Sequence, residues 1–180
     1  MSTATDPEQR ARLRAGIISL VVGTAIMAGK FFAYRLTGSS AIFSDALESI
    51  VNVLAAAFAI GSFLFAGRPA DRDHPYGHGK IEFLSAAFEC GLIAFAAIAI
   101  GHQAITTWIR GSELTQLDLG LGLTVVAGVA NALLAIYLLR VGRKTNSLIL
   151  IADGKHGLSD TWTTIGVVIG LVLVRRTGIA

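Results

Sequence analysis

Two polar clusters interrupt stretches of sequence that are otherwise apolar. The first reads "DALESIVN" at residues 45–52 and the second reads "DGKHGLSD" at residues 153–160. Both follow one pattern: aspartate, two residues, Glu or His, three residues, then Asn or Asp. Side chains four positions apart lie on one face of a helix, so each cluster would present its last two polar groups together.

The paired groups are the types that bind a divalent metal. Glu48 and Asn52 come from the first cluster, and His156 and Asp160 from the second. Facing each other, the two helices would offer two carboxylates, one amide oxygen and one imidazole. That set of four ligands suits a divalent transition metal in tetrahedral geometry.

The aspartate that opens each cluster lies about one helical turn before these ligands. We expect Asp45 and Asp153 to line an access path or to orient the metal ligands from outside. The alternative is that both clusters only join helices by hydrogen bonds. Two matched clusters favour a functional site, because ionisable groups inside a membrane are costly and usually functional.

A third cluster, "DRDHPYGHGK", lies between apolar segments at residues 71–80. Asp71, His74 and His78 are spaced by three and four positions, which also suits a metal. The alternative is a solvated loop with a Pro-Tyr-Gly turn.

Isolated polar residues within the apolar segments are weaker signals. Lys30 could reach the membrane surface or pair with an acid. Glu89 and Asn131 are either packing groups or part of the metal path. Cys90, the single cysteine, excludes an internal disulfide and is expected to be a small buried residue.

The segments that carry these groups are long enough to cross a membrane. Of 180 residues, 53% are hydrophobic and 15% charged, and the mean hydropathy is +0.65. Five apolar segments cover roughly residues 15–36, 40–66, 83–109, 117–139 and 147–174. In lipid each must be a helix, because a helix satisfies its own backbone hydrogen bonds. The sequence therefore predicts an all-α, polytopic transmembrane helix bundle.

Basic residues predict how the bundle lies in the membrane. The pI of about 9.4 comes from short basic loops, which set membrane topology, so we expect no nucleic acid partner. Residues 1–14 are predicted to be a cytoplasmic tail, followed by a transmembrane domain over residues 15–180. The basic residues of the cytoplasmic side are Arg10, Arg12, Arg14, Arg68, Arg72, Lys80, Arg140, Arg143 and Lys144.

Three motifs together resemble the cation diffusion facilitator family. They are "SDALESIVNV", "HPYGHGKIEFLSA" and "ADGKHGLSDTWTTIGVVIG", and they occur in the family's order. The resemblance covers essentially the whole chain. It implies a homodimer in the cell (inner) membrane that exports a divalent metal in exchange for protons.

The resemblance also implies residue roles. Glu48, Asn52, His156 and Asp160 would form the tetrahedral transport site between the second and fifth helices. Asp71, His74 and His78 would form a loop site found in some members.

Two features depart from the family pattern. The second-helix pair is Glu and Asn rather than His or Asp followed by Asp, so the substrate could be Zn²⁺, Fe²⁺ or Mn²⁺. The family's sixth helix and cytoplasmic domain are also missing from these 180 residues. Either the chain is a fragment, or the family's regulation and much of its dimer interface do not apply to it.

Other classes of function stay open alongside metal efflux. The chain could be a membrane scaffold or metal sensor that binds without transporting. An intramembrane hydrolase is disfavoured, because there is no His-Glu-x-x-His helix and no nucleophile beside a base. We therefore expect a protein that is not an enzyme.

Overall fold

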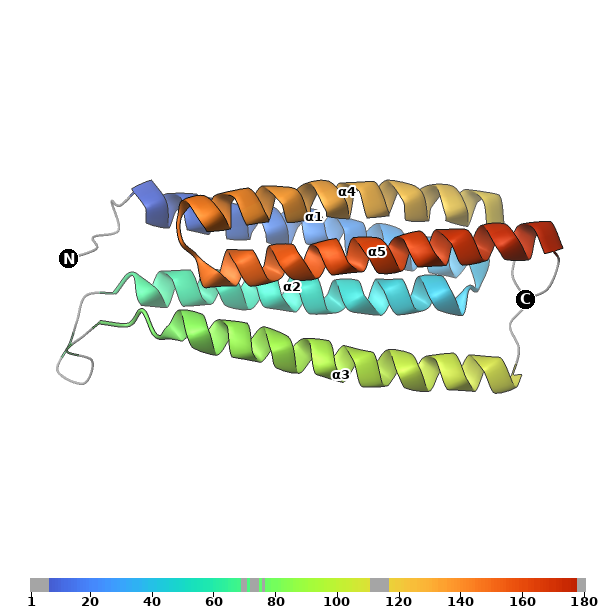
Figure 1. Ribbon diagram of the computed structural model, residues 1–180, viewed down its shortest axis with the longest axis horizontal. Helices are drawn as coiled ribbons and strands as arrows, with labels where there is room; N and C mark the ends of the chain where they lie inside the picture. The colour runs from blue at the N-terminus through green and yellow to red at the C-terminus, as the bar shows by residue number, and fades with distance from the viewer. Residues whose placement is uncertain (1–6, 69–70, 72–74, 76, 111–116, 178–180) are drawn as a thin grey trace.

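Five long helices run alongside one another in the computed structural model, which describes residues 7–68, 71, 75, 77–110 and 117–177 (Figure 1). Each is long and apolar enough to cross a membrane, which confirms the predicted all-α bundle. The helices are α1 (Pro7–Thr37), α2 (Ser40–Ala66), α3 (Ile81–Arg110), α4 (Leu117–Lys144) and α5 (Leu148–Thr177).

The helices extend beyond the apolar segments from which they were predicted. α1 begins at Pro7, so the described part of the predicted N-terminal tail is helical. α4 continues through its basic end to Lys144. Apolar length marks what lipid covers, whereas a helix continues for as long as its backbone hydrogen bonds do.

Two short turns bring neighbouring helices into contact. Gly38 has φ +66°, a left-handed conformation that glycine adopts without strain, and its N–H donates to the carbonyl of Tyr34. Ser39 then caps α2, because its hydroxyl accepts from the backbone N–H of Ile42. Asn146 takes the left-handed conformation between α4 and α5.

α4 and α5 pack with their backbones close together. A Cβ at Gly154 would lie 2.7 Å from Cγ of Leu139 and 3.0 Å from the carbonyl oxygen of Ala135. A Cβ at Gly157 would lie 3.0 Å from Cβ of Ala135. Small residues allow such approach between membrane helices.

α3 lies at one edge of the bundle, against α2 and α5 (Figure 1). Phe58 of α2 stacks on Phe88 of α3 with ring centroids 4.5 Å apart. The outward face of α3 is apolar, and Phe95 and Ile98 are more than two thirds exposed, as expected for contact with lipid. Cys90 is also exposed, so the prediction that it is buried was wrong: α3 is covered on one side only.

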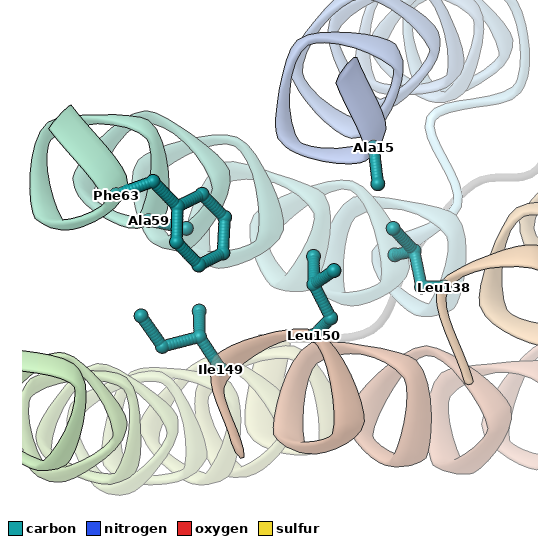
Figure 2. Packing of buried hydrophobic residues seen from close by; sticks show 6 residues of the cluster. All are labelled: Ala15, Ala59, Phe63, Leu138, Ile149 and Leu150. Atoms are coloured by element: carbon teal, nitrogen blue, oxygen red, sulfur yellow. The ribbon is translucent and has the colours of Figure 1, made fainter. Parts of the chain in front are cut away.

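Apolar side chains close the inner bundle near both ends. One cluster joins α1, α2, α4 and α5 where the chain enters α1 (Figure 2). A second joins α1, α2 and α5 near the α1–α2 turn. The buried polar residues of α1, α2 and α5 discussed below lie between these clusters along the helices. The first cluster consists of Ala15, Ala59, Phe63, Leu138, Ile149 and Leu150, and the second of Ala33, Ile42 and Leu171.

Candidate metal centre

The four predicted ligands lie on α2 and α5, which run in opposite directions through the middle of the bundle (Figure 1). On each helix the two residues are one turn apart and share a face. Asp160 is buried, whereas Asn52, His156 and Glu48 are partly buried.

Asp160 is the meeting point of three of the predicted ligands. Its Oδ2 accepts a hydrogen bond of 2.6 Å from Nδ2 of Asn52. Its Oδ1 lies 3.5 Å from Nδ1 of His156. Residues more than one hundred positions apart are thus in contact.

Two polar atoms on the residues that contact Asp160 are buried without a hydrogen-bond partner among the described residues. They are Oδ1 of Asn52 and Nε2 of His156. A buried polar atom without a partner costs free energy. An amide oxygen and an imidazole nitrogen are both able to bind a metal, so each atom could serve as a ligand.

Glu48 is next to this group but faces a different partner. Its Oε2 accepts a hydrogen bond of 3.1 Å from the hydroxyl of Thr163. Glu48 and His156 also line one cavity of about 80 Å³ between α2, α3 and α5. Within the described part of the chain, no three His, Cys, Asp or Glu side chains form a ready-made metal cluster. The predicted site with four ligands is therefore not preassembled among the described residues.

Asp45 forms an ion pair with a lysine. Nζ of Lys30 lies 2.8 Å from Oδ1 of Asp45, and both side chains are 1% exposed. The hydroxyl of Thr164 donates to the same oxygen at 3.0 Å. Of the two alternatives for Lys30, the structure shows pairing.

Asp153 lies on the other side of the ligands, toward the start of α5. The hydroxyl of Ser19 donates to its Oδ2 at 3.1 Å. Asp153 lines a cavity together with Asn52 and Asn131. The volume of about 10 Å³ is enough for one water molecule. Asn131 donates to the carbonyl of Gly157, while Oε1 of the buried Glu89 has no hydrogen-bond partner among the described residues.

The predicted loop site is described only in part. Oδ2 of Asp71 lies 3.3 Å from Nε2 of His78, so these two side chains meet. The ring of His78 packs edge-on against Phe65, with centroids 4.7 Å apart. His74 lies outside the described residues.

A family comparison agrees with this architecture. Residues 16–178 match the model of the cation efflux transmembrane domain. The chain belongs to the cation efflux family, the cation diffusion facilitators. It is therefore an integral membrane protein, and the resemblance of the three motifs is confirmed.

Three curated relatives of this family member illustrate the similarity. An uncharacterized transporter of Synechocystis sp., sll1263, is 39% identical over 162 residues, which are 90% of this chain and 52% of the relative. The manganese efflux system protein MneP of Bacillus subtilis is 29% identical over 94% of this chain and 57% of its own length. The cation-efflux pump FieF of Salmonella newport is 30% identical over 89% and 53%. The chain thus spans about half the length of these relatives.

Sequence reasoning overlooked the hydroxyl groups around the predicted ligands. Ser19, Thr163 and Thr164 each donate to one of the carboxylates that had been singled out. A signal for Thr164 was present, because it follows Asp160 by four positions and so shares its helix face. Ser19 carried no comparable signal, since nothing in the sequence orients α1 against α5.

Proposed function

We propose that this membrane protein is a divalent transition-metal efflux transporter. Its metal centre consists of Glu48, Asn52, His156 and Asp160. The observation that carries the proposal is that Asn52 and His156, which both contact Asp160, each have a buried metal-binding atom without a hydrogen-bond partner among the described residues. Binding a cation would replace the Asn52–Asp160 hydrogen bond with metal–ligand bonds.

The donor set favours manganese or iron(II) over zinc. One nitrogen and three oxygen-bearing side chains make a harder set than the thiolate and imidazole ligands typical of zinc. Manganese efflux by the relative MneP is in line with this choice. Zn²⁺ remains a test substrate, because imidazole and carboxylate also bind zinc.

Release of the metal is coupled to protons. Metal binding requires neutral imidazole and ionised carboxylates, so protons and metal compete for His156, Asp160 and Glu48. We infer that protonation on the far side of the membrane expels the metal and that the protonated groups then return. The outcome is antiport of metal against protons.

Orientation and assembly follow from the same proposal. The basic tail and loops favour a cytoplasmic N-terminus, and we propose that the membrane is the inner membrane of a bacterial cell. The protein functions as a homodimer. Asp71, His74 and His78 hold a second metal in the cytoplasmic loop.

The test is metal-driven proton flux by the full-length protein in proteoliposomes. Mn²⁺, Fe²⁺ and Zn²⁺ are supplied in turn, and lumenal pH and metal are recorded together. Asp160→Ala should abolish flux and weaken Mn²⁺ binding by more than about 100-fold, since even residues that only orient metal ligands contribute 10–100-fold. The matched control is Asp118→Ala, because Asp118 is a surface carboxylate that pairs with Arg175.

Two results would contradict the proposal. Normal transport by Asp160→Ala would exclude the metal centre. Mn²⁺ binding without flux would indicate a sensor or scaffold instead of a transporter.

A further inference from the structure

A buried ion pair lies beside the candidate metal centre. Nζ of Lys30 is 2.8 Å from Oδ1 of Asp45 and 3.3 Å from the backbone oxygen of the same residue. Each side chain is 1% exposed. Lysine and aspartate are almost never fully buried unless they are paired, and such a pair is retained at a large desolvation cost. A residue pair of this kind calls for a reason beyond packing.

The ion pair is connected to the metal centre through Thr164. The hydroxyl of Thr164 is 3.0 Å from Oδ1 of Asp45 and 2.9 Å from the backbone oxygen of Asp160. Along α2, Asp45 lies one turn before Glu48. The ion pair is therefore one helical turn from Glu48 and is linked through Thr164 to the backbone of Asp160.

Lys30 changes the net charge around the proposed ligands. Glu48 and Asp160 give the proposed ligand set a charge of −2, which matches a divalent cation. Asp45 would add a third negative charge one turn away. In a buried site with little water, a unit charge at this distance acts strongly on a bound dication. Lys30 cancels that charge.

We propose that Lys30 sets the net charge of the metal centre: by pairing with Asp45 it keeps the centre at −2, so that the centre releases a divalent cation as well as binding it. Lys30 and Asp45 are positioning residues, because they act on the cation through the field and through Thr164 rather than as ligands. The inference rests on the proposed function.

The test measures Mn²⁺ affinity and release in purified full-length protein at fixed pH and ionic strength. A His78→Ala background removes the loop histidine, so that the membrane centre dominates the signal. Lys30→Met should lower Kd by at least about tenfold and slow Mn²⁺ release, because the negative charge of Asp45 is then no longer cancelled and attracts the cation. Asp45→Asn should raise Kd by at least about tenfold, because it leaves the charge of Lys30 uncompensated.

The combined variant and a control separate charge from packing. Lys30→Met with Asp45→Asn removes both charges, so Kd should return to within about threefold of the parent. Arg35→Met makes the same charge change on α1 at an exposed position, where water screens it, and should leave Kd unchanged. A purely structural role would shift both single variants in the same direction.

Each outcome decides whether Lys30 sets the net charge of the metal centre. Opposite shifts of Kd in the two single variants support the inference. Shifts in the same direction, or no shift, overturn it. If Lys30→Met does not fold, Asp45→Asn and the double variant decide: a Kd that rises in Asp45→Asn and returns in the double variant supports the inference, and any other result overturns it. Asp160→Ala tests the proposed function separately, because Mn²⁺ affinity that is unchanged by this substitution refutes the metal centre itself.

Discussion

Adding one methyl group at Gly154 should destabilise the bundle, although alanine is the better helix former. A Cβ there would lie 2.7 Å from Cγ of Leu139, 2.9 Å from the backbone nitrogen of the same residue and 3.0 Å from the carbonyl oxygen of Ala135. Carbon atoms in contact prefer separations of roughly 3.5–4.0 Å. Two of the three obstructing atoms belong to the backbone, so rotating a side chain cannot relieve the overlap.

The expected cost follows from these distances. α4 and α5 must separate by several tenths of an ångström or more, and such overpacking costs about 1–3 kcal/mol. Gly166, also on α5, offers a matched control, because a Cβ there meets nothing within 4 Å. Gly166→Ala should raise stability by up to about 1 kcal/mol through helix propensity. The two variants should therefore differ by about 1–4 kcal/mol.

Thermal unfolding in detergent, followed by circular dichroism, measures this difference. Gly154→Ala should unfold several degrees below the parent protein, and Gly166→Ala at or slightly above it. Mn²⁺ binding should also weaken in Gly154→Ala, because the displaced helix carries His156 and Asp160. Equal melting temperatures for the two alanine variants would refute the close backbone contact between α4 and α5.

Three further predictions concern the carboxylates and their partners. Asn52→Asp should tighten Mn²⁺ binding by about tenfold, because it adds a negative charge to the site. It should also steepen the dependence of binding on pH, since one more group must lose a proton before the metal binds. Mn²⁺ titrations at two pH values measure both effects. In the unmodified protein, Mn²⁺ affinity should fall as pH is lowered from about 8 to 6, because protons compete for His156 and Asp160; an affinity that does not change would exclude this competition. Ser19→Ala should lower stability by about 1–3 kcal/mol, because the buried carboxylate of Asp153 loses its hydrogen bond from Ser19, and a melting temperature equal to that of the parent would contradict it.

The bundle could be predicted from sequence because lipid leaves so few alternatives. A long apolar segment in a membrane must be a helix, and five such segments lead to the observed architecture. The ends of the helices were harder to predict from the sequence. α1 begins at Pro7, within a polar stretch that apolar length cannot detect.

The candidate site could also be predicted from the sequence only in part. The shared spacing of the two clusters pointed to Asn52, His156 and Asp160, and the structure brings these side chains together. Their role as metal ligands stays a prediction. The partner of Lys30 could not be read from the sequence, because α1 is apolar on several faces and no pattern shows which face meets α2.

The apolar clusters at the two ends of the bundle should keep the protein from conducting ions when it is not transporting. An ion at the centre must cross a layer lined mainly by apolar side chains in either direction, near Phe63 at one end and near Ile42 at the other. A layer of this kind blocks ions by excluding water. Liposomes containing the protein should therefore hold a membrane potential until transport begins.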